Sequence, residues 1–255
     1  MTRLFLLHAL GASARSWDRV VAALPGHDCV ALDLPGFGDH AAMGHRSVAE
    51  TLDWFADEVA RHGCADWWVV GHSMGGKIAT LAAARARDGD ARLARLAGVV
   101  LVAASPPSPE PIDEERRAEM LDWFADGPAS SPQAEEYLSA NTANPLPSPL
   151  AQQVVADVRR SAPAAWRGWL AEGAREDWGG RAGVIDLPAL IVAGAEDGDL
   201  GADAQRRLNA PHYARPPVAV VADVAHLIPY EQPAALAALI AEHVEHPHTD
   251  YQGER

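Results

Sequence analysis

Cysteine is scarce in this chain: Cys29 and Cys64 are the only two among 255 residues. They cannot supply a disulfide framework, and with no CxxC pair they indicate no metal or redox site. We expect both to be small buried apolar residues. Near the end of the sequence, His243, His246 and His248 lack the spacing of a helical metal-binding pair. We therefore expect a solvated chain end there and no metal.

Long apolar runs and positive charge are scarce as well. No uninterrupted apolar stretch approaches the roughly 18–20 residues that a membrane-spanning helix requires. The 21 Lys and Arg residues are outnumbered by 35 Asp and Glu, which leaves a formal net charge of −14. Nucleic acids and anionic membrane surfaces bind clustered positive charge, so we expect neither as a partner. The sequence also lacks the GxGxxG and GxxxxGK(S/T) motifs, and we expect no cofactor.

The first residues imitate a weak signal peptide, with Arg3, an apolar run over residues 4–10 and small residues at 12–14. The run is short for such a signal and contains His8. A core strand that leads into a catalytic loop explains the same residues better, so we expect a cytoplasmic protein.

The sequence does contain a regular alternation of two patterns. Short runs rich in Val, Leu and Ile are separated by Ala-rich segments of helical period, which is typical of a parallel sheet covered by helices on both faces. The expected strands are residues 3–8, 29–33, 67–71, 98–103, 189–193 and 218–222. The expected helices are residues 16–24, 47–62, 75–87, 203–208 and 233–244.

The segment from residue 106 to residue 182 departs from this alternation. It contains no strand-like run, and 9 of the 19 prolines lie between Pro106 and Pro149. The Ser-Pro and Ala-Pro pairs that begin at residues 131, 148 and 162 are typical helix starts. We therefore predict a helical cap at 106–182, inserted into a core domain that consists of residues 1–105 and 183–255.

Residues 71–76, Gly-His-Ser-Met-Gly-Gly, connect an expected strand to an expected helix. A serine in such a tight turn is held in a strained backbone conformation, and the flanking glycines are needed because a side chain would collide with the neighbouring strand or helix. The turn projects the Ser73 hydroxyl out of the sheet and leaves the Met74 N–H at a helix N-terminus, where it can stabilise an oxyanion. We expect His72 to point away from the serine and to pack.

A serine hydroxyl is a poor nucleophile unless a base, and an acid that orients the base, are nearby. Asp197 follows an expected strand, and His226 lies in the loop after the last one. The order Ser73, Asp197, His226 matches one hydrolase architecture. Glu196 and Asp199 are close enough in the sequence to replace Asp197, and the sequence leaves that choice open.

Together these motifs resemble the α/β-hydrolase superfamily, in particular its lidded esterases, lactonases, haloperoxidases and carbon–carbon hydrolases. The resemblance spans almost the full length and rests on residues 7–11, 33–38, 71–76, 194–197, 225–226 and 231–233. It implies the α/β-hydrolase fold, with a mostly parallel sheet of about six strands, flanked by helices, and an inserted helical cap. It also implies that the backbone N–H groups of Leu10 and Met74 form an oxyanion hole and that His8 braces the loop of Leu10.

Apolar cap residues are expected to shape the substrate pocket, namely Met120, Trp123, Phe124, Trp166 and Trp169. Trp166 and Trp169 share a helical face by their spacing, so they either line the pocket or pack the cap onto the core.

We predict a serine hydrolase that cleaves a small to medium, mostly apolar carboxylic ester through an acyl-enzyme. Its partner is a small ester-like molecule. Lactone opening, carbon–carbon bond cleavage and peracid formation use the same three side chains and stay open as alternatives. The alternative from another class is a non-catalytic ligand-binding protein on the same scaffold. Such a protein would lack one of the three side chains Ser73, Asp197 and His226, and none is missing here.

Overall fold

The computed structural model describes residues 1–63 and 65–247, so that Cys64 and His248 lie outside the described residues. In this part of the chain, six parallel strands form one sheet in the order β2-β1-β3-β4-β5-β6. Their bounds are β1 Arg3–Leu7, β2 Asp28–Leu32, β3 Trp67–His72, β4 Leu96–Val102, β5 Ala189–Gly194 and β6 Val218–Val221. The six expected strands are all present, with ends that differ by at most two residues.

Two interior strands of the sheet, β3 and β5, are buried on both faces. Every residue of β3 and β5 is buried, which is why these segments read as continuous apolar runs without alternation. Successive side chains of a strand point to opposite faces. Accordingly, Val69 belongs to the core on one face with Phe55, and Val70 belongs to the core on the other face with Trp17.

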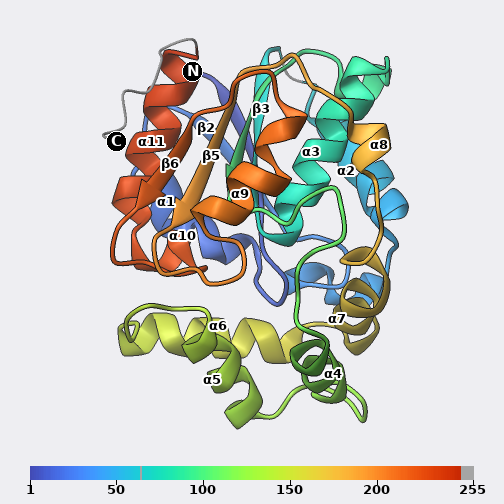
Figure 1. Cartoon of the computed structure of the whole chain (residues 1–255), viewed down its shortest axis with the longest axis vertical. Helices are drawn as coiled ribbons and strands as arrows, with labels where there is room; N and C mark the ends of the chain where they lie inside the picture. The colour runs from blue at the N-terminus through green and yellow to red at the C-terminus, as the bar shows by residue number, and fades with distance from the viewer. Residues whose placement is uncertain (64, 248–255) are drawn as a thin grey trace.

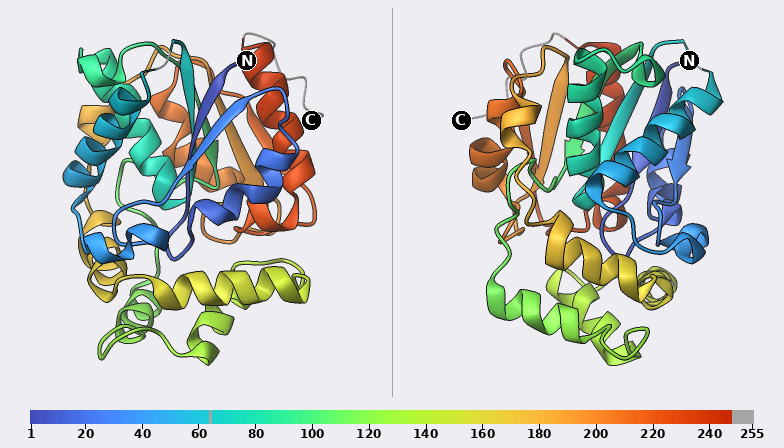
Figure 2. Two further views of the ribbon diagram at one scale, coloured as in Figure 1. Left: turned by 180° about the vertical axis from the view of Figure 1, so that it is seen from behind. Right: turned by 90° about the vertical axis from the view of Figure 1, so that its right-hand side faces the viewer.

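Helices cover both faces of the sheet (Figures 1 and 2). The helices of the core are η1 Ala14–Trp17, α1 Asp18–Ala22, η2 Gly38–Met43, α2 Val48–His62, α3 Met74–Arg87, η3 Ala91–Leu93, α9 Ala202–Leu208, η5 Ala210–His212, α10 Ile228–Glu231 and α11 Pro233–Glu245. Helices α1 and α11 pack on one face, and α2 and α3 pack on the other. Helix α2 starts where the sequence predicts, because Ser47 and Glu50 form a capping box, and it ends at Gly63 in the left-handed conformation with φ 53°.

The long segment between β4 and β5 forms a separate layer of helices. Its elements are α4 Glu114–Asp122, α5 Ser131–Ala140, α6 Ser148–Arg160, α7 Pro163–Gly168, the π-helix η4 Trp169–Gly173 and α8 Gly179–Ala182. Figures 1 and 2 show α4 to α7 gathered across the carboxyl ends of the strands, whereas α8 lies beside α3. The predicted starts of α5, α6 and α7 carry proline in the first turn, where its missing N–H costs no hydrogen bond.

Two expectations about single residues need correction. His243 is only 3% exposed, because it continues the buried face of α11 three residues after Ile240, and its ring lies 5.5 Å from the ring of Trp68. This part of the chain end is therefore packed, although His246 is exposed. Cys29 is half-buried, because β2 lies at the edge of the sheet.

None of the described helices combines the length and the apolar character that crossing a membrane takes.

Candidate active site

Ser73 occupies a strained turn between β3 and α3. Its backbone angles are φ 50° and ψ −117°, a conformation that costs free energy for any residue with a side chain. The neighbouring strand and the first turn of α3 hold it there, because the Ser73 N–H donates to the Val102 carbonyl at 3.0 Å and its own carbonyl accepts from the Gly76 N–H at 2.7 Å. This turn directs the hydroxyl toward the carboxyl end of the sheet, as in a nucleophile elbow.

Three glycines permit this turn because backbone atoms crowd it. A Cβ on Gly71 would lie 2.4 Å from the carbonyl oxygen of Gly75, and a Cβ on Gly75 would lie 2.5 Å from the carbonyl oxygen of Leu7. On Gly76 it would lie 2.3 Å from the Cβ of Ala104. Real Cβ atoms do not approach so closely, so each substitution would displace the sheet or the helix.

His226 and Asp197 meet at the same end of the sheet from the loops after β6 and β5. The Nδ1–H of His226 donates to Oδ2 of Asp197 at 2.8 Å. The other oxygen, Oδ1, accepts the backbone N–H groups of Asp199 at 3.2 Å and Leu200 at 3.0 Å. The turn of the loop thus aims Asp197 at the histidine, while Glu196 and Asp199 make no hydrogen bond to His226 among the described residues.

The two groups stabilise each other's charged forms. Burial disfavours a charge on the His226 ring, but the charge and the hydrogen bond of Asp197 outweigh burial and raise the pKa of His226 above its usual value. Burial also disfavours the carboxylate of Asp197, yet the facing imidazolium and its hydrogen bond hold the pKa of Asp197 below its usual range. Desolvation, and secondarily the charge of Asp197, raise the pKa of Asp199. Asp197 is therefore the ionised partner of the histidine.

Ser73, Asp197 and His226 all line one pocket of about 210 Å³ between the sheet and the cap. All three residues are largely shielded from solvent, and Ser73 is 6% exposed. In the described part of the chain, no hydrogen bond joins the Ser73 hydroxyl to the His226 ring. Such bonds are often long in the absence of substrate and shorten when the complex forms.

Leu10 and Met74 flank the serine from two elements. Met74 is the first residue of α3, and Leu10 lies in the loop after β1. The Gly75 N–H donates to the His8 carbonyl at 3.2 Å, which ties this loop to the turn of Ser73. The His8 ring accepts the Leu34 N–H on Nε2 at 2.9 Å and contacts the Ala9 carbonyl through Nδ1 at 2.8 Å. His8 therefore braces the loop, in the position that the sequence suggested.

The structure separates the five expected pocket residues into two groups. Met120 and Trp169 line the pocket of Ser73. Trp123, Phe124 and Trp166 do not line it, and for these three the expectation is corrected. They pack inside the cap, where the rings of Phe124 and Trp166 stack at 4.6 Å. The indole N–H of Trp166 also donates to the carbonyl of Met120 at 2.8 Å, which holds this ring inside the cap.

Sequence reasoning missed several polar residues of the pocket wall. Tyr137 on α5 reaches across from the cap, and its hydroxyl donates to the Leu10 carbonyl at 2.7 Å. Glu110 lies in a proline-rich stretch without periodic pattern, and Arg116 lies on α4, whose start was not predicted. Asp113, which caps α4 by accepting the N–H groups of residues 115 and 116, is the signal that was available for that helix.

Acidic groups dominate the charge of the pocket. Four carboxylates line it, from Glu110, Glu196, Asp197 and Asp199, against the single guanidinium of Arg116. One nitrogen of that guanidinium, Nη1, donates to Glu119 and to Glu136 at 2.6 Å each, so two further carboxylates offset its charge. Burial raises the pKa of Glu110, as it does for Asp199. The pocket therefore disfavours further negative charge.

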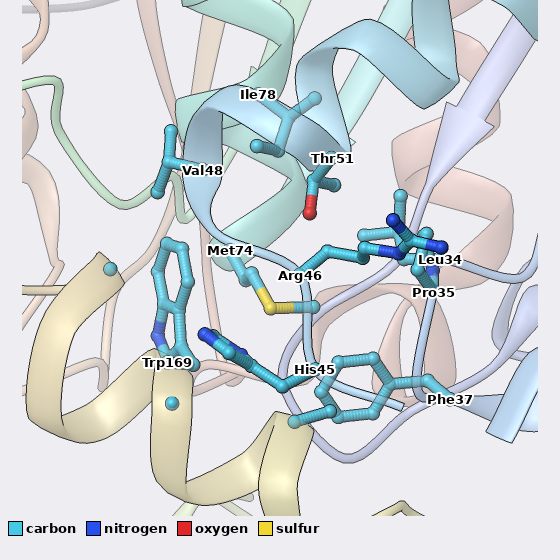
Figure 3. A pocket seen from close by; sticks show the side chains of 13 residues that line it. Leu34, Pro35, Phe37, His45, Arg46, Val48, Thr51, Met74, Ile78 and Trp169 are labelled. Atoms are coloured by element: carbon cyan, nitrogen blue, oxygen red, sulfur yellow. The ribbon is translucent and has the colours of Figure 1, made fainter. Parts of the chain in front are cut away.

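A second, narrower pocket is lined by Met74 and by Trp169, which also lines the pocket of Ser73 (Figure 3). Its wall is mostly apolar, with Phe37, Val48 and Ile78, and His45 also lines it. Its volume is about 30 Å³, which is room for one or two water molecules and too little for a substrate. Trp169 lines both pockets and sits at the start of the π-helix η4.

Residues 1–63 and 65–247 contain no group of three or more His, Cys, Asp or Glu side chains arranged to hold a metal ion.

The chain has relatives among known proteins. The model of the alpha/beta hydrolase family matches residues 4–239. A 2-succinyl-6-hydroxy-2,4-cyclohexadiene-1-carboxylate synthase from Enterobacter sp. (strain 638) is 26% identical over 246 residues, which cover 94% of this chain and 90% of the relative. A thermophilic esterase from Thermogutta terrifontis superposes with a TM-score of 0.78 at 23% identity, over 98% of this chain and 91% of the esterase. For a bromoperoxidase from Bacillus anthracis the TM-score is 0.80 at 17% identity, with coverages of 94% and 91%. At these identities the structural likeness shows the fold alone.

Proposed function

Because the chain belongs to the alpha/beta hydrolase family, we propose that it is a serine hydrolase that cleaves small to medium, mostly apolar carboxylic esters. One observation carries the proposal: His226, hydrogen-bonded to Asp197 at 2.8 Å, lines the same pocket as the strained Ser73. A base that is oriented by a carboxylate and placed beside a serine at an elbow is the arrangement that activates a hydroxyl.

The reaction proceeds in two acyl transfers. His226 takes the proton of the Ser73 hydroxyl as the oxygen attacks the ester carbonyl, and the N–H groups of Met74 and Leu10 bind the oxyanion. The intermediate collapses, the alcohol leaves with the proton from His226, and an acyl-enzyme remains. Water then attacks the acyl carbon and gives its proton to His226. The second collapse releases the carboxylic acid and returns the proton to Ser73.

The pocket supports a substrate of modest size and little charge. Its volume of about 210 Å³ is below the roughly 300–1,000 Å³ that is typical of drug-sized ligands. Met120, Trp169 and Leu170 supply apolar wall on the cap side. The excess of carboxylates favours a neutral or cationic molecule and repels an anionic one.

The name of the Enterobacter relative points to a second candidate, because it describes the formation of a cyclic carboxylate. Similarity over 94% of this chain favours that candidate. The four acidic side chains around the pocket disfavour it, because the guanidinium of Arg116 in the described pocket wall already pairs with two glutamates. We therefore place ester hydrolysis first.

The test is a panel of aryl esters of increasing acyl length, with lactones, diketones and hydrogen peroxide as a second acceptor, and with the relative's own synthase reaction as a further arm. We expect hydrolysis of short and medium neutral esters, and stoichiometric labelling of Ser73 by a fluorophosphonate. Ser73→Ala should lose both. Folded protein that is inert to the probe and to every ester would overturn the proposal, and turnover in the synthase arm alone would replace it by the second candidate.

A further inference from the structure

His72 precedes the candidate nucleophile, yet its side chain contacts the candidate base. It is the last residue of β3 and is fully buried. Its Nε2 lies 2.8 Å from the backbone carbonyl oxygen of His226, and the two imidazole rings lie 5.2 Å apart. The ring of His72 also lies nearly perpendicular to the ring of Trp17, with the two ring centroids 6.3 Å apart. Packing was the expectation from the sequence, and the contact with the His226 backbone adds to it.

The chemistry of this contact defines the state of the His72 ring. A carbonyl oxygen only accepts hydrogen bonds, so Nε2 carries the proton. Nδ1 is buried without a hydrogen-bond partner in the described chain, which suits an unprotonated nitrogen. Burial, and secondarily the charge of His226, lower the pKa of His72 to about 3, although Asp197 opposes the shift and His8 adds to it. His72 therefore stays neutral and keeps one donor pointed at His226.

Three further contacts hold the backbone around the base. The Ala225 N–H donates to Glu231 at 3.0 Å, and the Leu227 N–H donates to the carbonyl of Asn141 in the cap at 3.0 Å. The His226 carbonyl also accepts the Ile228 N–H at 3.0 Å, within its own loop. Among the described residues, His72 is thus the side chain from the sheet that fixes the carbonyl of His226.

A short path of bonds through His72 connects the candidate nucleophile to the candidate base. One peptide bond joins His72 to Ser73, and one hydrogen bond joins His72 to His226. The backbone of Ser73 is itself pinned to β4 through Val102. A displacement of about 1 Å between reacting groups can cost on the order of 10²-fold in rate, so a connection of this kind matters for turnover.

We propose that His72 is a positioning residue, which holds His226 at the distance and angle from which it can take the proton of Ser73. The inference rests on the proposed hydrolase function. His72 does not line the pocket of Ser73, and its hydrogen bond goes to the backbone of His226. It acts through the His226 backbone, and its loss should therefore reduce kcat and leave KM nearly unchanged.

The variants are His72→Phe, which keeps a ring but removes the donor, and His72→Gln, whose amide nitrogen can replace Nε2. His212→Phe is the matched control, because His212 also contacts a backbone carbonyl, that of Gly183 at 2.9 Å, and does not line the pocket of Ser73.

We expect His72→Phe to lower kcat by about 10- to 100-fold on a neutral aryl ester. The acid limb of its kcat/KM profile should move to lower pH as the His226–Asp197 contact loosens. His72→Gln should recover part of the loss, and His212→Phe should retain wild-type kcat.

A second measurement does not depend on activity or on the folding of a variant. In ¹⁵N-histidine NMR spectra of the wild-type protein, His72 should show a protonated Nε2 and a bare Nδ1, with no titration between pH 5 and 9. A ring that titrates near pH 6.5, or a His72→Phe enzyme with wild-type kcat and pH profile, would overturn the positioning role while the hydrolase proposal stands. If the wild-type protein hydrolyses no ester, the hydrolase proposal fails by itself, and an unchanged His226 spectrum in His72→Phe then rejects the inference separately.

Discussion

The carboxylate of Glu231 accepts the backbone N–H of Ala225, the residue before His226, at 3.0 Å. Its other oxygen accepts the N–H groups of Ala143 and Asn144 in the cap, at 2.9 and 3.1 Å. One side chain at the end of α10 therefore bridges the cap and the loop of the candidate base. Cap docking and placement of His226 depend on the same carboxylate.

Replacing this carboxylate tests the coupling. Glu231→Gln keeps the shape but leaves one accepting oxygen for three donors, so either the cap or the histidine loop loses its partner. Hydrogen bonds to a charged group contribute about 1.5–3 kcal/mol each, and we expect a loss of unfolding free energy of about 1–3 kcal/mol together with a lower kcat. Urea denaturation and ester kinetics measure the two effects. Glu135→Gln, an exposed change on α5, serves as control, and equal behaviour of the two variants would contradict the bridge.

The identity of the acid is tested by two asparagine substitutions. Asp197→Asn removes the charge that orients the His226 ring and should lower kcat by on the order of 10⁴-fold, as loss of the equivalent charge does in serine proteases. Asp199→Asn removes a neighbouring carboxylate that makes no hydrogen bond to His226 in the described chain, and we expect a change of only a few-fold. Steady-state hydrolysis of a neutral aryl ester measures both. The reverse ranking would reassign the acid to Asp199.

The pH dependence of hydrolysis follows from the raised pKa of His226. The base must be neutral to accept the proton of Ser73, so activity is present above the pKa of His226 and is lost as the pH falls through it. Because Asp197 raises that pKa above 6.5, the half-maximal point of kcat/KM should lie above pH 6.5 in the wild-type protein. A stopped-flow or initial-rate series from pH 5 to 9 locates it. A profile that stays flat down to pH 5 would be incompatible with His226 as the base.

Stability at alkaline pH should report on Lys77, the single lysine of the chain. It is fully buried, and its Nζ donates to the carbonyls of Gly173 and Glu176 at 2.9 Å each, joining α3 to the cap. Burial lowers the pKa of Lys77 to about 8, against 10.5 for the unperturbed group. Between these values the unfolded chain binds more protons than the folded one, so the lysine's contribution to stability rises with pH.

Lys77→Met lacks this titration and provides the comparison. The difference in unfolding free energy between the wild-type protein and Lys77→Met should increase by about 1–2 kcal/mol from pH 7.5 to pH 9.5 in favour of the wild type. Urea denaturation of both proteins at pH 7.5, 8.5 and 9.5 measures the trend. Parallel curves would show that the lysine does not change its charge in this range.

Much of the fold was predictable because its signals are local. The interior strands β3 and β5 contain short apolar runs, Trp-Trp-Val-Val and Leu-Ile-Val-Ala, and the start of α2 carries its capping box in the sequence itself. The elbow was predictable for the same reason, since Gly71, Gly75 and Gly76 are needed wherever backbone approaches this closely. Helix α4 was missed because its segment is charged and follows a proline-rich stretch.

The direction of side chains was less predictable. Glu196, Asp197 and Asp199 are near neighbours with similar chemistry, and only the turn held by the N–H groups of residues 199 and 200 aims one of them at His226. The cap tryptophans illustrate the same point. Trp169 faces the pocket and Trp166 the cap interior, although the two share a helical face in the sequence pattern.

The sequence by itself determined the order of strands and helices along the chain, the strained serine turn, and the types of side chain available near that turn. These depend on periodicity and on backbone sterics within a few residues, which any part of the chain carries with it. Only the tertiary structure decided which carboxylate meets the histidine, which aromatic rings reach the pocket, and that His72 donates to the carbonyl of His226. Those outcomes depend on contacts between segments that lie apart in the sequence, by 29 residues for Asp197 and His226 and by 154 for His72 and His226, and local patterns do not encode such contacts.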